Sequence, residues 1–123
     1  MNLKTTLKLE ELSGLVLAMF YFYHLPYSWG LFALLFFLPD LGMLGYLSGP
    51  RTGAFTYNIF HHKGIAIFLV LGGLQAGIMW LQLAGTVLYA HSCFDRVLEY
   101  GLKTDRGFSY THLGKIGREK KHP

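Results

Sequence analysis

The sequence predicts an all-α protein: a four-helix transmembrane bundle with both termini cytoplasmic and a short basic C-terminal tail. Three observations lead to this prediction. Hydrophobic residues make up 52% of the 123 residues and charged residues only 15%, whereas a soluble domain has about a quarter of its residues charged. The apolar residues form four runs separated by helix breakers, and no Lys or Arg occurs in residues 12–50, 52–62 or 64–95. This composition excludes a disordered chain, and the single cysteine excludes a scaffold held by internal disulfides.

The four apolar runs suit membrane-spanning helices, which need about 20 mostly apolar residues each. Pro26 ends the first run, the turn at residues 48–50 ends the second, and a glycine pair at residues 72–73 ends the third. We therefore predict spans at residues 12–25, 29–47, 52–71 and 78–101. Residues 1–101 then form a four-span transmembrane domain, and residues 102–123 form a basic cytoplasmic tail.

The basic residues indicate the orientation of the bundle. Lys4 and Lys8 precede the first predicted span, Arg51 lies between the second and the third, and six more basic residues follow the fourth. The other two connections contain no Lys or Arg. Because short loops rich in Lys and Arg stay in the cytoplasm, we predict a multi-pass protein of the cell (inner or plasma) membrane with cytoplasmic N- and C-termini.

The C-terminal tail is predicted to interact with the membrane surface. Clusters of basic residues such as Arg118, Lys120 and Lys121 are attracted to anionic lipid headgroups. Residues 108–114 combine two aromatic residues, a leucine and His112, and we expect this segment to fold back on the bundle. The expected partners are membrane lipids and not nucleic acid, and a homodimer is left open.

Small residues recur in the second span at Gly42, Gly45 and Gly49, and again at Gly73 and Gly77. Such spacings let helices approach one another closely. We therefore expect these glycines to lie in helix–helix contacts.

Ionisable side chains within the predicted spans are the candidates for a functional site, because such groups are costly in a membrane and face the protein interior. Asp40 lies in the second span, His61 and His62 in the third, and His91 with Asp95 in the fourth. Counting helix rise from the cytoplasmic ends puts these groups about 9–15 Å deep. Groups from three helices are thus predicted to meet in one layer.

Helical spacing supports the same site. Residues four apart differ by only about 40° around a helix and share a face. His91 and Asp95 form such a pair, and so do Tyr57 and His61. The supporting polar residues are predicted to be Asn58, Tyr57 and His112.

Each of these groups also has a purely structural interpretation. Asp40 follows Pro39 and can cap a helix that restarts there. His91 and Asp95 can form a buried pair that fixes helix packing, and the third-span histidine can face lipid headgroups. A joint site is favoured because all of these groups fall at one predicted depth.

The residue types in this layer suit a divalent metal such as zinc. Zinc binds imidazole and carboxylate ligands, and a catalytic zinc keeps three protein ligands and one open position. We therefore predict His61, His91 and Asp95 as metal ligands, with Asp40 as the catalytic general base or a fourth ligand. Such a centre predicts a metal-dependent hydrolase that acts on a lipid-like or small substrate.

A second function fits the same sequence, and whether the protein is an enzyme is left open. A non-enzymatic small membrane protein would carry protons, ions or small molecules on its Asp and His groups, or would be a structural partner in a larger complex. The chain lacks the internal repeats from which alternating-access carriers are built, an objection that a dimer would remove. Metal content distinguishes the hydrolase from these alternatives.

Six segments also carry a resemblance to a known family. They are LPDLGMLGY at 38–46, GPR at 49–51, GAxxYNxxH at 53–61, AHxxxDR at 90–96, EYGLK at 99–103 and THLGKI at 111–116. Together they resemble the bacterial family known as domain of unknown function 4260, small integral membrane proteins with no established activity. The resemblance covers nearly the whole chain and implies the four-helix fold and the membrane location. It also selects His61, not His62, as the site histidine, and implies a small residue at the position of Glu99.

Overall fold

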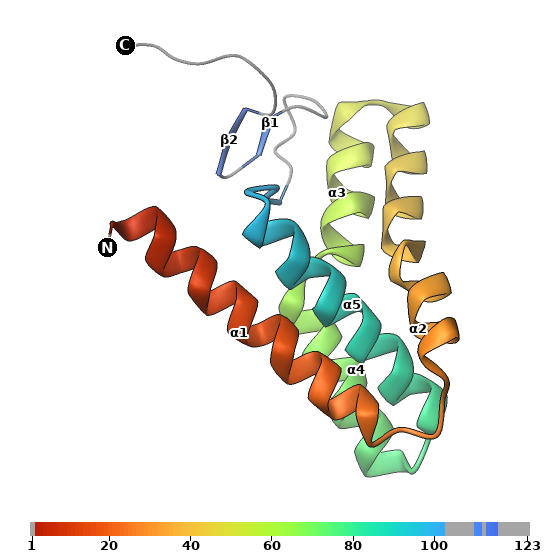
Figure 1. Ribbon diagram of the computed structural model, residues 1–123. Coiled ribbons are helices and arrows are strands. Elements are labelled where there is room, and N and C mark those ends of the chain that lie inside the picture. The colour runs from red at the N-terminus through yellow and green to blue at the C-terminus, as the bar shows by residue number, and fades with distance from the viewer. Residues whose placement is uncertain (1, 103–109, 112, 116–123) are drawn as a thin grey trace.

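The computed structural model describes residues 2–102, 110–111 and 113–115 (Figure 1). In chain order its helices are α1 (Leu3–Tyr23), α2 (Trp29–Phe36), the 3-10 helix η1 (Leu38–Ser48), α3 (Pro50–Phe60), α4 (Lys63–Ala76) and α5 (Met79–Val97). Two short strands, β1 (Tyr110–Thr111) and β2 (Gly114–Lys115), pair in antiparallel fashion. The predicted all-α class is confirmed. His112, Arg118, Lys120 and Lys121 lie outside the described residues, so the lipid contacts of the tail stay predictions.

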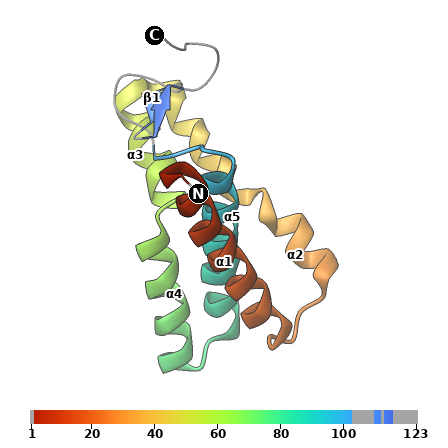
Figure 2. The same ribbon diagram turned by 60° about the vertical axis from the view of Figure 1, so that its left-hand side comes forward.

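α5 is the central helix of the fold. It packs extensively against both α1 and α4. Between α1 and α4 in the chain, α2 leads to a hairpin formed by η1 and α3 (Figures 1 and 2). Buried apolar side chains of α1, α2, α5 and the α1–α2 connection form the main core, which consists of Ala18, Phe22, Leu25, Phe32, Leu83, Val87 and Ala90. The η1–α3 hairpin stands at the end of α5 where the helix approaches its C-terminus.

The second predicted span is two helices, because α2 ends at Phe36 and η1 begins at Leu38. Pro39 lacks an N–H group and disfavours α-helical backbone in the residue before it, which breaks a continuous α-helix here. In a 3-10 helix residues three apart share a face, so Pro39, Gly42 and Gly45 line up along η1. This face is turned toward α3.

The glycines of η1 allow close contact with α3, as predicted. A Cβ atom at Gly42 would lie 2.9 Å from the carbonyl oxygen of Thr56 and 3.0 Å from Cα of Tyr57. The hydroxyl of Thr56 donates a hydrogen bond to the carbonyl oxygen of Gly42 over 2.6 Å. Gly49, by contrast, lies in the turn before α3 with φ +117°, and nothing lies within 4 Å of its Cβ position.

The third predicted span is also broken, since α3 and α4 meet at an angle of 43°. α3 ends with His61 as its C-terminal cap, and the side chain of His62 caps α4 by accepting a hydrogen bond from the N–H of Ile65. The predicted helix end at residues 72–73 was wrong. α4 runs to Ala76 because its terminating residue is Gly77, which has the left-handed φ of +71°.

α5 ends in a hydrogen-bonded Schellman turn. The N–H of Tyr100 bonds to the carbonyl oxygen of Asp95 over 2.7 Å, and that of Glu99 to Arg96 over 3.0 Å. Glu99 has φ +70°, the only positive φ among the described non-glycine residues. This position usually holds glycine, which explains why the family resemblance implies a small residue there.

Two ion-pair groups tie α1 to the rest of the bundle. Glu99 pairs with Lys8 over 2.8 Å and with Lys4 over 3.5 Å. Nζ of Lys63, the first residue of α4, lies 2.6 Å and 2.7 Å from the two carboxylate oxygens of Glu11. Lys63 is therefore neutralised by a partner on α1.

One stretch, Trp29–Ser48, is long and apolar enough to cross a membrane, with 20 residues and a mean hydropathy of 1.7. The bent pair of α3 and α4 passes the same test when it is counted as one span. No other helix in the described part of the chain passes; α1 carries Lys8, Glu10 and Glu11, and α5 carries several polar side chains. The helical character of the four predicted spans is thus confirmed, and their number as membrane spans is not.

Gly42→Ala is expected to destabilise the η1–α3 hairpin by roughly 1–3 kcal/mol, because the added methyl group would overlap backbone atoms of α3. Thermal unfolding in detergent, followed by circular dichroism, measures the effect. Gly72→Ala is the matched control, since nothing lies within 4 Å of its Cβ position and alanine is favoured in a helix by about 0.5–1 kcal/mol. A Gly42→Ala protein as stable as the wild type would contradict the close packing.

Glu99→Gly is expected to raise the free energy of unfolding in high salt by about 1 kcal/mol, because glycine adopts a positive φ without strain. The gain should be smaller in low salt, where the ion pairs with Lys4 and Lys8 are not screened. Chemical denaturation at two salt concentrations measures both values. Glu99→Gln keeps the strained backbone, so a gain of the same size in that variant would refute the explanation.

Candidate metal centre

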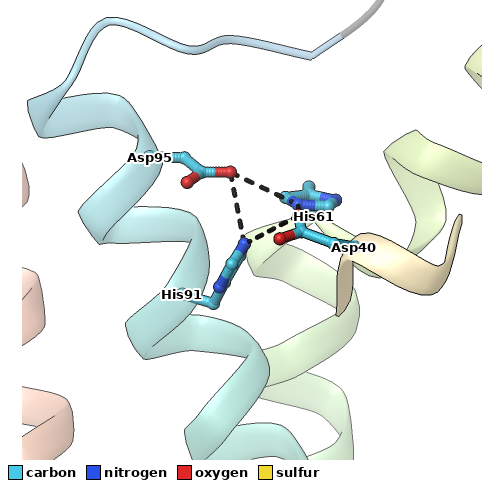
Figure 3. A group of neighbouring side chains, drawn as sticks. All are labelled: Asp40, His61, His91 and Asp95. Carbon is cyan, nitrogen blue, oxygen red and sulfur yellow. Dashed lines mark ion pairs between the residues drawn. The ribbon is translucent and has the colours of Figure 1, made fainter. Parts of the chain in front are cut away.

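The four ionisable residues predicted to meet do come together (Figure 3). Asp40 lies in the first turn of η1, His61 at the bend between α3 and α4, and His91 and Asp95 one turn apart on α5. One ligand atom from each residue lies within 4.8 Å of the other three. The side chains of His61, His91 and Asp95 are buried, whereas that of Asp40 is 36% exposed.

Nitrogen and oxygen atoms alternate around this group. Nε2 of His61 lies 3.4 Å from Oδ1 of Asp40 and 3.3 Å from Oδ2 of Asp95. Nε2 of His91 lies 3.3 Å and 3.4 Å from the same two oxygens. Adjacent ligands of a tetrahedral zinc ion are about 3.3–3.4 Å apart, because the bonds to zinc are about 2.0–2.1 Å long. The four nitrogen–oxygen separations therefore fit such an ion, and the nitrogen–nitrogen and oxygen–oxygen separations lie within 4.8 Å.

The two imidazoles do not use these short separations for hydrogen bonds. Nε2 of His61 and Nε2 of His91 are buried and have no hydrogen-bond partner in the described part of the chain. A buried polar atom left without a partner costs about 1–3 kcal/mol. Both nitrogens instead face the space between the carboxylates, which is the arrangement of ligands around a common cation.

His61 is held so that Nε2 is free to act as a ligand. Its Nδ1 lies 2.8 Å from the carbonyl oxygen of Tyr57. A carbonyl oxygen only accepts hydrogen bonds, so Nδ1 carries the proton and Nε2 keeps its lone pair. The ring of Tyr57 also stacks on His61, with centroids 3.8 Å apart and planes 9° from parallel. Metal-binding histidines are oriented by such contacts of the second nitrogen.

Asp95 and the carbonyl group of His61 have further partners. The hydroxyl of Tyr57 donates to Oδ2 of Asp95 over 3.5 Å. The guanidinium of Arg96 donates to the carbonyl oxygen of His61 over 3.3 Å and to that of Tyr100 over 3.2 Å. Arg96 thus connects the end of α5 to the bend that carries His61.

His91 is fixed by aromatic packing. Its ring centroid lies 5.0 Å from that of Phe36 on α2 and 5.0 Å from that of His61. Nδ1 of His91 has no hydrogen-bond partner within the described residues. Ring contacts with Phe36 and His61 therefore contribute to the orientation of this residue.

The structure shows contacts with the centre for some of the other predicted site residues and leaves the rest untested. Tyr57 is buried and contacts both His61 and Asp95. Asn58 follows it on α3 and is half-buried, and its supporting role stays a prediction, as does that of His112, which lies outside the described residues. Asp40 turns its carboxylate toward the two imidazoles rather than capping η1 (Figure 3).

Sequence reasoning missed Arg96 and Phe36. Arg96 directly follows Asp95, so a basic residue beside a predicted ligand was the available signal. Phe36 carries no polar group, and nothing in its spacing distinguishes a ring that packs on a site histidine. The bend at His61 coincides with a polar interruption of the apolar run at residues 61–64, which was available as a signal for a break.

A family model described as Domain of unknown function (DUF4260) matches residues 4–116. The chain belongs to this family. No curated protein and no solved structure matches the chain. All four residues of the candidate metal centre lie within the matched segment, and the chemistry of the centre has to be argued from its own geometry.

Proposed function

We propose that this DUF4260 protein is an integral membrane protein that binds one divalent metal ion, such as zinc, and uses it to hydrolyse a lipid-like substrate. The ligands are Asp40, His61, His91 and Asp95. One observation carries the proposal: two buried imidazole nitrogens lie 3.3–3.4 Å from two carboxylate oxygens without forming hydrogen bonds to them.

The charge of the group favours a cation. With neutral imidazoles, the carboxylates of Asp40 and Asp95 bring two negative charges together in a mostly buried place. Burial of charge is costly unless a counter-charge is present. Two nitrogen and two oxygen donors favour zinc or a related transition metal over magnesium and calcium, which prefer oxygen ligands alone.

The position of Asp40 supports a catalytic centre. His61, His91 and Asp95 are buried and would hold the ion, whereas the carboxylate of Asp40 is partly exposed on the open side. A zinc ion supplies Lewis acidity and lowers the pKa of a bound water to about 7. Asp40 is placed to act there as an exchangeable fourth ligand or as a base for that water.

The number of ligands also supports a second candidate, a structural metal site. Four protein ligands are typical of structural zinc, whereas catalytic zinc has three. In that case the ion would only join η1, the α3–α4 bend and α5. The two functions predict different effects of replacing Asp40. If the metal is structural, the replacement would unfold the metal site. If the metal is catalytic, the site would still hold the ion, but hydrolysis would be slow.

A membrane location is supported by the surface of the molecule. Large apolar side chains are exposed on every helix, including Leu34 at 72%, Leu47 at 88% and Phe68 at 75%. Soluble monomers rarely expose contiguous apolar surface on this scale. The proposed location is the cell membrane, with the four helical segments crossing it, both termini in the cytoplasm and the metal centre in the cytoplasmic half.

The purified protein, stripped with a chelator and reloaded with zinc, is expected to retain one zinc ion per chain. His61→Ala and His91→Ala should each lose most of it, because each removes a nitrogen ligand, and mass spectrometry of metal content measures this. His24→Ala is the control, since His24 is an exposed residue whose Nδ1 bonds to the carbonyl oxygen of Phe20. Equal metal content in the wild type and in a His61→Ala/His91→Ala double variant would refute the metal centre.

Topology reporters fused after Pro123 and after Arg51 are expected to read cytoplasmic. A reporter inserted after Gly77, between α4 and α5, should read external, because that connection contains no Lys or Arg. Alkaline phosphatase and green fluorescent protein fusions provide the two opposite readouts. An external C-terminal fusion would overturn the four-span arrangement while leaving the metal measurement unaffected.

A further inference from the structure

An apolar groove of about 380 Å³ runs along α5 and faces α2 and η1. All ten residues that line it are apolar or aromatic. A polar ligand placed in it would lose hydrogen bonds to water without replacing them. The chemistry of the groove therefore selects a hydrocarbon chain.

One end of this groove lies at the metal centre. Pro39 and Leu41, which line it, are the two neighbours of Asp40 in the chain. Phe60 also lines it and directly precedes His61. These three residues are chain neighbours of two of the predicted ligands, so this end of the groove lies next to the centre although no ligand itself lines it.

The groove continues away from the metal along one face of α5. Leu83 and Val87 line it, and His91 and Asp95 follow them at the same four-residue spacing. Each residue is offset by about 40° from the one before, so the row winds slowly around the helix from the groove to the ligands. From Trp80 at the far end to His91 there are eleven residues, or about 16 Å of helix. The groove is therefore long and apolar, and it leads to the ligands.

A larger cavity, of about 630 Å³, lies beside the N-terminal half of α1. It is not a better site for the substrate. Its lysines are engaged, because Lys8 pairs with Glu99 and Lys63 with Glu11. Arg96, which also lines it, donates to two backbone carbonyl groups. A ligand of the metal centre lines neither this cavity nor the groove, so the wholly apolar lining of the groove is what favours it for a hydrocarbon chain.

We propose that the groove along α5 holds the fatty acyl chain of a lipid ester, with the ester carbonyl group at the metal centre. The inference rests on the proposed hydrolase function and names its substrate class. Water adds its oxygen to the carbonyl carbon, the bond from that carbon to the alcohol oxygen breaks, and one water proton passes to the alcohol oxygen. The products are a fatty acid and an alcohol, and Asp40 at the end of the groove is placed to carry the proton.

The first test uses two photoreactive stearic acids with the zinc-loaded full-length protein in phosphatidylcholine vesicles. One acid carries its diazirine near the carboxyl group and the other near the methyl end. Peptide mass spectrometry is expected to find the first attached around Pro39–Leu41 and the second around Trp80–Leu83. Lipid-facing positions such as Phe68 give the background, which should be the same for both acids. Identical labelling patterns for the two acids would refute the inference.

The second test fills the groove. Ala84 is half-buried and lines it, so Ala84→Trp should lower groove labelling by the methyl-end acid by about tenfold or more without changing zinc content. Ala33→Trp, at an exposed position on α2, is the matched control and should label as the wild type does. Undiminished labelling of Ala84→Trp with zinc bound would overturn the proposal.

Hydrolysis of methylumbelliferyl esters provides the substrate readout. Ala84→Trp is expected to lower kcat/KM for the palmitoyl ester by about tenfold relative to the butyryl ester, because only the long chain reaches the filled part of the groove. An unchanged ratio would refute the acyl site. A wild type that binds no zinc yet shows ordered labelling would refute the proposed metal function and leave the chain-binding groove standing, so the two failures are distinguishable.

Discussion

The candidate metal centre depends on the break between α3 and α4. At His61 the helix ends, and the carbonyl oxygen of Tyr57 accepts hydrogen bonds from both the backbone N–H and Nδ1 of His61, at 3.0 Å and 2.8 Å. His24, which caps the end of α1, makes the same Nδ1 contact with Phe20. A histidine that caps a helix C-terminus thus uses one nitrogen on its own helix and projects the other beyond it. For His61, the projected nitrogen meets the ligands of η1 and α5.

The position of Asp40 follows from local chain chemistry of a different kind. Pro39 ends the α-helical hydrogen bonding, and glycines at every third position suit a 3-10 helix with one very narrow face. Because Gly42 and Gly45 have no side chains, η1 packs directly on the backbone of α3. The carboxylate of Asp40 is thereby brought to the end of α3, where His61 lies.

The sequence predicted which residues meet but not the backbone that brings them together. Charges in the loops fixed an orientation, and helix rise then placed Asp40, His61, His91 and Asp95 at one depth. The break at Phe37 lies in an apolar stretch that hydropathy treats as continuous, with Pro39 as its signal, and the break at His61 coincides with the polar residues 61–64. Neither signal gave the angle at the break, because hydropathy does not record hydrogen bonds. Helix rise could not distinguish His61 from His62, because adjacent residues lie at nearly the same predicted depth in the membrane. The choice of His61 came from the family motif at residues 53–61. Their different positions, His61 in the candidate metal centre and His62 as the cap of α4, became visible only with the bend.

The same arrangement couples metal binding to the attachment of the hairpin. η1 and α3 pack extensively on each other, whereas the contacts of α2 and the hairpin with α5 are sparse. Asp40 and His61 belong to the hairpin and its end, and His91 and Asp95 belong to α5, so the ligand set bridges the two parts. Without a cation the facing carboxylates of Asp40 and Asp95 repel each other. An ion bound in the proposed centre would remove that repulsion and add its binding free energy to the docked state alone, so the proposed metal would stabilise the fold around the groove as well as supply its chemistry.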